Sequence, residues 1–498
     1  MSTGGLIGAA ANTYLEVKNT KVMNSQIASY GGKAGGFFGR CNVANLTVLT
    51  ENGGENRVED TTVESEKSAA GGLIGASYGT LNKWDIEGVS VQSSRISNEN
   101  VGTSTELAQS AGGLVGYASA ISSLILSQIT VGGATEIEGY RAGGLIGYAG
   151  GSTGISLMES IDVGCQSGGA GGVTQDAEYT SILGSIGAGG LFGTNEVQKE
   201  EKSSARVQIQ KTRIGAYCKN NNEIAGVGGI TGRKYLDDPA QSIICVYDDV
   251  SIIDCVIAAN SSNKSDIKIQ CGGLYGRVMQ QNGTEKKMCF YNPKLTNNSI
   301  GYAPSLTSME ELKKFTNTSD NVYLLTGTGS SDHWSNLDIT EDNVGTYALR
   351  IGNYIGTWQA SGKHLYILRP ELTYDSNFQG SRAAIDVGNL NTGTQKNDTV
   401  YGLGYPYSWR SNCHIVYFEP TVKTDTAKLD SNLKVNSEDE YLYGSLEDIV
   451  NEYHSNASGE EYLEDYNLNI KLDEKNSILD YYNKCCKDGQ NTRTLNGV

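Results

Sequence analysis

One five-residue pattern, Gly-Gly-apolar-x-Gly, recurs along this chain and constrains its fold more than any other feature. The eight copies begin at Gly4, Gly35, Gly71, Gly112, Gly143, Gly189, Gly228 and Gly272. Neighbouring copies start 31 to 46 residues apart, which is a period typical of repeat architectures in which each repeat supplies one unit of a stacked array. We therefore expect one elongated repeat structure in the first part of the chain.

The residue types at each position of the motif indicate why it recurs. The third position is always large and apolar, from Leu6 to Leu274, and the residue before the first glycine is always small or Cys. These columns predict a core ladder, and the glycines predict places where a Cβ would obstruct a corner or a neighbouring coil. Because the fourth position also admits Thr231 and Tyr275, we expect it to be less enclosed than the third.

The segments between the motifs have the alternating pattern of short strands. Examples are YLEVKNTKVMNSQI at 14–27 and SLILSQITVGG at 123–133, in which β-branched residues alternate with polar ones. The first proline is Pro239, so no earlier strand loses a ladder hydrogen bond to proline. The predicted fold class is mainly β, a parallel β-solenoid or β-helix. A β-propeller of similar period is the alternative, although its hairpin-turn signals are scarce.

Three regions are expected. Residues 1–300 form the glycine-rich solenoid of about eight repeats, 301–425 a smaller β-rich or α+β module, and 426–498 an acidic, partly helical segment. Within the second region, Ser308 and Glu311 form a capping box that predicts a short helix. Residues 430–480 hold 14 acidic and 3 basic side chains, which favours a solvated acidic face, with a docking surface for a basic partner or calcium as the alternative.

Composition excludes several classes of function. The net charge of −17 argues against nucleic acid as a partner, because phosphate binding needs clustered Lys and Arg. No window approaches the roughly 18 consecutive apolar residues of a membrane span. The N-terminus has neither the basic nor the apolar region of a signal peptide. The ten cysteines contain no C-x-x-C and no zinc-type spacing.

Motifs of known catalytic chemistry are not found either. The four histidines, His333, His364, His414 and His454, lie outside any H-E-x-x-H motif, and no G-x-S-x-G elbow or P-loop lysine motif occurs. We therefore predict no catalytic, cofactor-binding or metal-binding residues and no cofactor. A weaker constellation would suit a β-helix enzyme that cleaves acidic polysaccharides with calcium; it comprises Arg233, Lys234, Asp237, Asp238, Asp248 and Asp249.

The cysteines are interpreted mainly as packing residues. Cys271 occupies the small-residue column before the first glycine and is expected to fill the core. Cys245, Cys255 and Cys289 could pair, and their connectivity is open. Cys485 and Cys486 are expected to be free or to pair elsewhere, as adjacent cysteines seldom bridge each other.

The repeated A-G-G-L-[IV]-G, followed by an Asn/Ser-rich strand, resembles the GLUG-type repeat of large bacterial surface proteins. Such repeats occur in adhesin-like proteins and in the non-catalytic portion of some immunoglobulin-A-cleaving metallopeptidases. The resemblance covers about residues 3–280. It implies a scaffold at the bacterial cell surface or outside the cell, without the zinc motif of those peptidases.

The functional expectation is a non-enzymatic, adhesin-like stalk whose C-terminal module caps it or contacts a ligand. Its partners are expected to be host or microbial surface glycans or proteins. Because residue 4 already lies inside a repeat, we also expect the chain to continue from, or pack on, further upstream coils. The alternatives are a β-helix polysaccharide lyase or hydrolase and an accessory region of a larger secreted peptidase.

Overall fold

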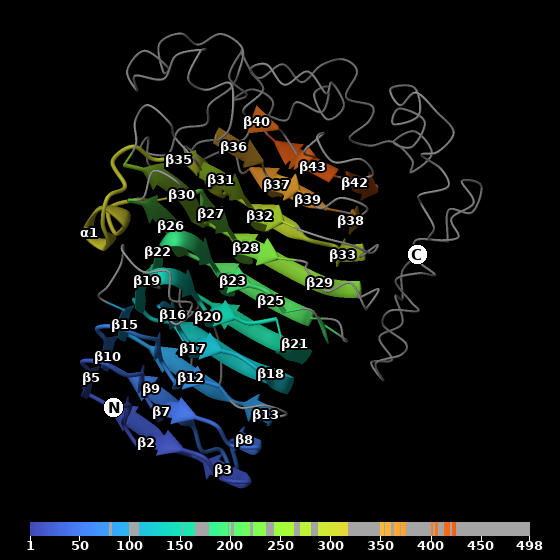
Figure 1. Ribbon diagram of the computed structural model, residues 1–498. Helices are drawn as coiled ribbons and strands as arrows, with labels where there is room; N and C mark the ends of the chain where they lie inside the picture. The colour runs from blue at the N-terminus through green and yellow to red at the C-terminus, as the bar shows by residue number, and fades with distance from the viewer. Residues whose placement is uncertain are drawn as a thin grey trace, which may run out of the picture.

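The chain winds into a parallel β-solenoid whose rungs stack from the N-terminal end towards the C-terminal end (Figure 1). The computed structural model describes residues 1–78, 82–98, 109–151, 153–164, 179–197, 199–200, 204–219, 223–235, 244–262, 269–279, 287–316, 349–352, 354–359, 363–368, 370–374, 400–401, 404–406, 413–418 and 421–424. Within these ranges the strand pairings are parallel. The predicted solenoid is thereby confirmed, and the hairpin-built propeller does not apply.

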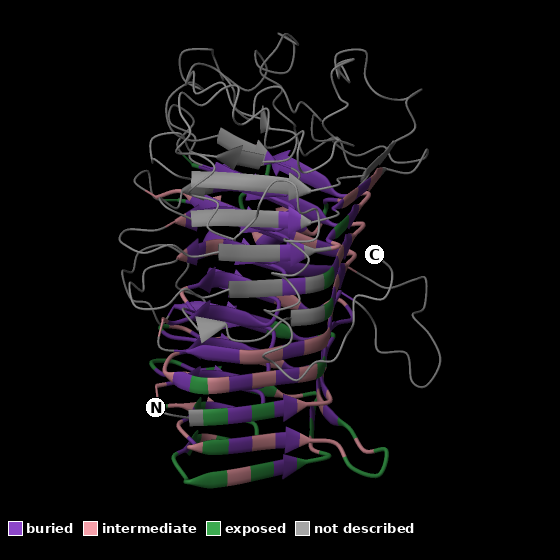
Figure 2. Cartoon of the chain, turned by 90° about the vertical axis from the view of Figure 1, so that its right-hand side faces the viewer, coloured by how far each residue is buried: buried purple, intermediate pink, exposed green. Residues whose placement is uncertain are grey.

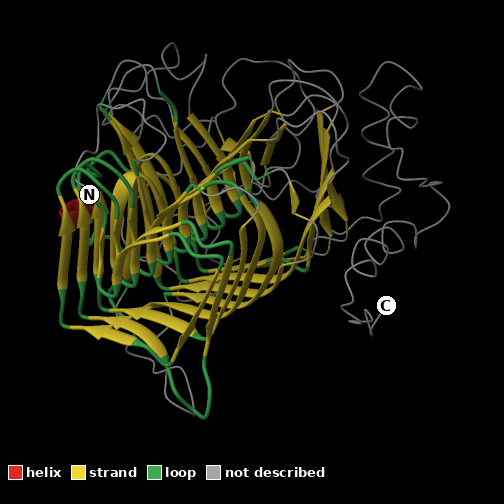
Figure 3. Ribbon diagram, turned by 60° about the horizontal axis from the view of Figure 1, so that its bottom comes forward, coloured by secondary structure: helices red, strands yellow, loops and turns green. Residues whose placement is uncertain are grey.

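The strands belong to three sheets that meet at corners, as the view in Figure 3 shows. Sheet A contains β1 (Thr3–Gly4), β5 (Gln26–Ser29), β6 (Ala34–Gly35), β10 (Thr62–Ser65), β11 (Ala70–Gly71), β15 (Arg95–Asn98), β16 (Ser110–Gly112), β19 (Glu136–Gly143), β22 (Thr180–Gly189), β26 (Thr212–Cys218), β27 (Ala225–Gly228), β30 (Val256–Ser261), β31 (Ile269–Gly272), β35 (Ser299–Tyr302), β36 (Leu349–Gly352) and β40 (Val400–Tyr401). Sheet B contains β2 (Ile7–Ala10), β7 (Phe38–Cys41), β12 (Ile74–Ser77), β17 (Val115–Ala118), β20 (Ile146–Ala149), β23 (Phe192–Asn195), β28 (Thr231–Tyr235), β32 (Tyr275–Met279), β37 (Ile355–Gln359) and β41 (Gly404–Pro406). Sheet C contains β3 (Tyr14–Lys18), β4 (Lys21–Met23), β8 (Asn45–Leu49), β9 (Asn56–Glu59), β13 (Asn82–Glu87), β14 (Val89–Gln92), β18 (Ile121–Gly132), β21 (Gly154–Val163), β24 (Lys199–Glu200), β25 (Ser204–Gln210), β29 (Ile244–Ile253), β33 (Lys287–Tyr291), β34 (Lys294–Thr296), β38 (Lys363–Leu368), β39 (Glu371–Tyr374), β42 (Cys413–Phe418) and β43 (Thr421–Thr424).

The glycine motif forms the junction between sheets A and B in each of the eight rungs that carry it. Its first glycine ends a strand of sheet A and its fourth residue begins a strand of sheet B. The register keeps each motif column aligned, because Ala70 pairs with Ala34 on one side and with Ala111 on the other. The columns deduced from sequence are therefore ladders in the structure.

The third and fourth positions of the motif both point into the core. Leu73, Leu145 and Leu274 are completely buried, whereas Leu6 in the first rung is 44% exposed. The expectation that the fourth position is less enclosed is wrong, because Thr231 and Tyr275 are also 0% exposed. The chain bends between these two positions, so consecutive side chains can both face inward. Figure 2 shows the buried interior and the more exposed rungs at the N-terminal end.

Two further corners of each coil are made by residues with left-handed backbone. At the corner between sheets C and A, the residues with positive φ are Asn24, Asp60, Ser93, Gly133, Ala134, Gly164, Lys211, Asp254 and Asn297. L-residues other than glycine adopt this conformation at a cost of about 1–2 kcal/mol. Many are followed by a residue whose side chain bonds the local backbone; for example, Ser94 Oγ donates to the Gln92 carbonyl oxygen at 2.7 Å. This geometry turns the chain without requiring a glycine in every rung.

The described part of residues 301–425 continues the same three sheets. β36 pairs with β31, β37 with β32, and β38 with β33, and β40–β42 add a further rung. In these residues, the region expected to be a separate β-rich module instead carries solenoid rungs. The segment 426–498, with its expected acidic face, helices and Cys485–Cys486 pair, lies outside the described residues.

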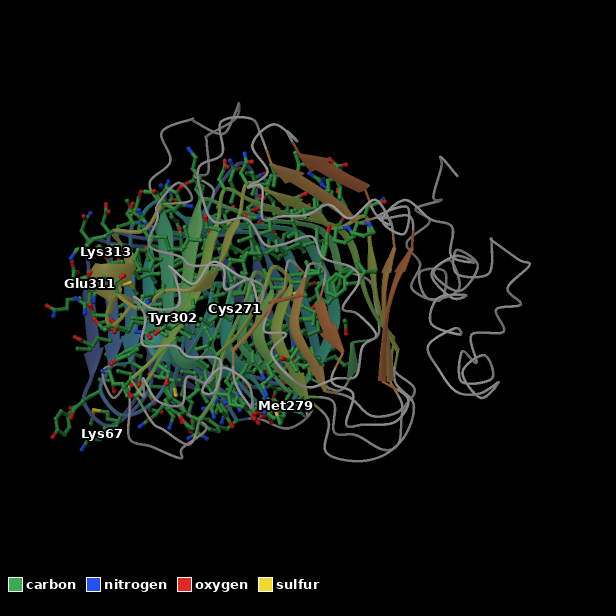
Figure 4. All side chains as sticks on the ribbon, turned by 90° about the horizontal axis from the view of Figure 1, so that it is seen from above. Lys67, Cys271, Met279, Tyr302, Glu311 and Lys313 are labelled. Atoms are coloured by element: carbon green, nitrogen blue, oxygen red, sulfur yellow. The ribbon has the colours of Figure 1, made fainter. Side chains whose placement is uncertain are left out.

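The predicted capping box is confirmed in the insertion between β35 and β36. Helix α1 (Met309–Leu312) has Ser308 as its N-cap, and Ser308 Oγ accepts a hydrogen bond from the Glu311 amide at 3.3 Å. Leu312 packs over Gly215 on the outside of sheet A, in a small apolar cluster separate from the solenoid core. Lys313 Nζ lies 2.6 Å from Glu136. Figure 4 shows Glu311 and Lys313 on the outside of the solenoid.

Candidate binding surface

The outer faces of sheets A and B approach each other at the glycine corner. A Cβ on Gly35 would lie 2.0 Å from the carbonyl oxygen of Phe38, and a Cβ on Gly75 would lie 2.5 Å from that of Ala34. The first and last glycines of the motif thus bring two backbones together on the outside of the coil. The second glycine faces inward, since a Cβ on Gly72 would lie 3.0 Å from Cγ1 of the core residue Val91 and 2.0 Å from the Gly113 carbonyl oxygen in the next rung.

Side chains that flank this corner form what we call the corner face. On sheet A the wall is the column two residues before the first glycine: Lys33, Ala69, Ser110, Arg141, Gly187, Gly226 and Gln270. On sheet B it is the column after the last glycine: Arg40, Ala76, Tyr117, Tyr148, Thr194, Arg233, Arg277 and Thr357. Contacts across the corner join the walls, as when Ser110 Oγ donates to the Gly116 carbonyl oxygen at 2.7 Å.

Tyrosines line the N-terminal part of the corner face. The rings of Tyr78, Tyr117 and Tyr148 stack along three successive rungs, with centroids 5.0 and 5.1 Å apart. Cations lie over the ends of the stack: Lys33 Nζ is 4.8 Å from the centroid of Tyr78, and the Arg141 guanidinium is 5.3 Å from that of Tyr148. These tyrosines pack with Ala69 and Ala76 in a cluster that is separate from the solenoid core.

The middle of the corner face combines tyrosines, an arginine and carboxylates. Tyr148 donates a hydrogen bond to Glu196 at 2.5 Å, whereas the neighbouring Tyr140, whose ring packs in the solenoid core, donates a short one to Glu223. Burial, followed by these hydrogen bonds, raises the pKa of both phenols above their usual range. Arg141 is 8% exposed, and burial and the nearby Arg233 charge lower the pKa of its guanidinium.

The C-terminal part of the corner face holds two arginines on adjacent rungs. Arg233 pairs in register with Arg277, and Thr194 and Thr357 occupy the rungs on either side. Arg233 Nη2 donates to the Tyr235 hydroxyl. The opposite wall is reduced to Gly226 beside Arg233, where a Cβ would lie 2.8 Å from the arginine Cγ. The glycine therefore makes room for the arginine stem to lie across the corner.

The structure separates the basic residues that the sequence grouped as a weak lyase-like constellation. Arg233 belongs to the corner face, but the neighbouring Lys234 points into the solenoid and is 2% exposed. Lys234 Nζ donates to Asn195 Oδ1 at 3.1 Å and to the Val197 carbonyl oxygen at 2.9 Å. A buried lysine held by these groups is not positioned to act as a base on an external polymer.

The acidic members of that constellation do not join Arg233 in the described residues. Asp249 is exposed on β29 in sheet C, where its carboxylate lies 3.9 Å from Lys294 Nζ. Asp237 and Asp238, and the side chain of Asp248, lie outside the described residues. In the part of the chain that the structure describes, no group of three or more His, Cys, Asp or Glu side chains could hold a metal ion.

Two of the buried cysteines that the structure describes, Cys41 and Cys271, are free thiols. Cys271 is 0% exposed in the column expected from sequence, next to Val227, and Figure 4 shows it within the solenoid. Cys255 is also buried and takes a position held by Ser or Thr in most other rungs, with its thiol 3.2 Å from the Ile253 carbonyl oxygen. The side chains of Cys245 and Cys289 lie outside the described residues.

Sequence reasoning did not identify the corner face. One signal was present: the residue after the last glycine is Tyr in G-Y-A at 116–118 and 147–149, and Arg in three other copies. A search of the chain against protein families, curated proteins and solved structures finds no match. Among the described residues, no helix is both long and apolar enough to cross a membrane.

Proposed function

We propose that this chain is a non-enzymatic, adhesin-like scaffold of a bacterial surface or secreted protein. The observation that carries the proposal is the single hydrophobic core, which runs without interruption from Val17 in the first coil to Leu372 near the other end. Stacked coils that share one core behave as one stiff element, because each coil buries its apolar face only against its neighbours. Such an element suits a stalk or spacer.

The dimensions agree with that role. Sheet B has ten strands in the described residues, and strands are spaced by about 4.8 Å, so its rungs extend over about 43 Å. The resemblance of the A-G-G-L-[IV]-G motif to GLUG-type repeats supports a location at the cell surface or outside the cell. Surface glycans or proteins are the partners proposed with it.

The placement of the charged residues favours this proposal over a polysaccharide lyase. Lys234 lies inside the coil and Asp249 on a different sheet from Arg233, so these groups do not converge on one substrate. Incubation of the full chain with acidic polysaccharides and calcium should release no unsaturated products. Accumulation of such products would contradict the proposal and establish the enzyme.

The stalk itself is tested by hydrogen exchange. A continuous core predicts slow exchange of the sheet B amides from β7 to β32, in one cooperative unit, with faster exchange in the exposed first rung. Separate exchange classes for neighbouring rungs would mean independent globular units and would remove the basis for a stiff spacer. Labelling of intact source cells with an antibody against the chain tests the surface location.

A further inference from the structure

We propose that the side chains of Lys234 and Asn195 become joined by an amide bond between two adjacent rungs of the solenoid. This modification goes beyond the scaffold function and does not depend on it, because it requires only the arrangement of the solenoid interior. Three observations support it: the residue types of one interior column, the contacts of the two side chains, and the register of a neighbouring strand.

Interior columns of the solenoid repeat one residue class, and one column of sheet B departs from this rule at two rungs. Its register aligns Ala118, Ala149, Asn195, Lys234 and Val278. The two alanines and the valine belong to the hydrophobic core, and Asn195 and Lys234 are 0% and 2% exposed. Packing alone would favour a small or apolar side chain at both positions. A carboxamide and an amine on adjacent rungs therefore indicate a function that involves both of them.

The two side chains are in contact, in an arrangement that suits attack of the amine on the carboxamide. Lys234 Nζ lies 3.1 Å from Asn195 Oδ1, which brings the nitrogen within reach of the Cγ atom that carries this oxygen. The backbone amide of Val197 donates to the same Oδ1 at 2.8 Å. This hydrogen bond polarises the carbonyl group and stabilises the negative charge that develops on the oxygen during attack.

The register of sheet C places an acidic residue in an adjoining interior column. In β24, Glu200 pairs with the core residue Ile155. Trp84 holds this column in an earlier rung, and its indole donates to the carbonyl oxygen of Val43, the counterpart of Val197. The column therefore adjoins the corner where the amine lies. A carboxyl group at this position can take a proton from the lysine ammonium and pass it to the departing nitrogen.

The proposed reaction is a transamidation that balances without an oxidant or a second substrate. The Lys234 ammonium loses one proton, its nitrogen forms a bond to Cγ of Asn195, and the Cγ–Nδ2 bond breaks. Nδ2 takes a second proton from the attacking nitrogen and leaves as ammonia, which the first proton converts to ammonium. The product is a neutral amide. Because the site is buried, water is kept away from this amide and does not hydrolyse it.

Mass spectrometry of the full chain under denaturing conditions tests the bond. We expect the intact mass to be lower than the mass of the sequence by one ammonia. After tryptic digestion, the peptides that contain Asn195 and Lys234 should be recovered as one branched species. The branched peptide distinguishes the bond from cyclisation of Asn195 to a succinimide, which also releases ammonia but leaves the two peptides separate.

Lys234→Met should abolish the branched peptide, whereas Lys294→Met, which removes an exposed lysine on β34, should retain it. In Glu200→Gln, the fraction of branched chains shortly after cell-free synthesis should fall about tenfold, because a proton-transfer group is lost.

The proposal is overturned if the wild-type chain has the full mass of its sequence and yields two separate peptides, a result that does not depend on the folding of any variant. Equal branched fractions in Glu200→Gln and wild type would overturn the role assigned to Glu200. The scaffold function stands in either case, since its tests are hydrogen exchange and the polysaccharide assay.

Discussion

Replacing one inward-facing glycine should disrupt the stack far more than its small added volume suggests. In Gly113→Ala, the new Cβ would lie 2.0 Å from the carbonyl oxygen of Gly144 and 2.8 Å from Val131 Cγ1. Ordinary contacts of a Cβ begin at 3.4 Å, so the neighbouring rung must move by about 1.4 Å. That displacement falls on backbone, which cannot rotate away as a flexible side chain would.

The magnitude follows from what the displacement breaks. The Gly113 amide bonds the Gly143 carbonyl at 3.0 Å, and the Leu114 amide bonds the Leu145 carbonyl at 2.9 Å. Losing two such bonds costs about 1–3 kcal/mol, and the strain of overpacking adds about 1–3 kcal/mol. We therefore expect Gly113→Ala to lower the free energy of unfolding by about 2–6 kcal/mol.

Urea denaturation followed by far-ultraviolet circular dichroism measures the effect, and Gly31→Ala is its matched control. Gly31 has no atom within 4 Å of the added Cβ, so this variant should stay within about 1 kcal/mol of wild type, with any change towards greater stability. Equal midpoints for Gly113→Ala and Gly31→Ala, at equal slopes, would show that the rungs do not pack as described. The explanation of the glycine columns would then fail.

Three further predictions concern the corners, the thiols and a half-buried acid. Ser93 has φ 48° and is exposed, so Ser93→Gly should keep or slightly raise the urea midpoint. Ser93→Val should lower the free energy of unfolding by about 1–2 kcal/mol, because a β-branched residue is strained at this φ. The reverse order of the two variants would contradict the left-handed conformation at this corner. Burial raises the pKa of Cys41 to about 11 and raises that of Cys271 further. Iodoacetamide at pH 8 should therefore label both thiols only after the protein unfolds. Labelling of either thiol in the native protein, mapped by mass spectrometry, would contradict their burial. Burial raises the pKa of Glu138 above its usual value, so ionisation of this carboxyl disfavours the folded state. Glu138→Gln should therefore increase stability at pH 7, and the gain should disappear as the pH falls below the unfolded pKa of about 4.3. Thermal melts from pH 7 to pH 4 measure this, and a gain that persists at pH 4 would contradict it.

The repeat and its core could be predicted because packing imposes the same requirement on every rung. A residue at the third motif position faces the same position in the next coil, so Leu73, Leu114 and Leu145 reveal the ladder from sequence alone. The later rungs are not evident from the sequence because their motif is altered. The ninth copy reads Gly-Asn-Tyr-Ile-Gly at 352–356, with Asn353 at the second glycine position, and follows its predecessor after 80 residues.

The left-handed corners and the corner face could not be predicted for a different reason. Asn24, Ser93 and Lys211 occupy equivalent corners, yet they share no side-chain property, since the backbone and a local hydrogen bond satisfy the turn. The corner face is likewise defined by which columns face each other across two sheets. Which columns face each other depends on the direction in which the chain bends at the glycines. The spacing of residues in the sequence does not determine that direction.

The interior and corner columns differ in how strongly packing restricts their residue types. Interior columns repeat one residue class, because a larger side chain would strain the next rung and a smaller one would leave a cavity beside it. The column after the last glycine is also largely buried, yet it changes from Tyr117 and Tyr148 to Thr194 and then to Arg233 and Arg277. Packing of the core does not require this succession, since these side chains lie outside the coil. The residue types in this column are therefore not fixed by the core, unlike those of the interior columns.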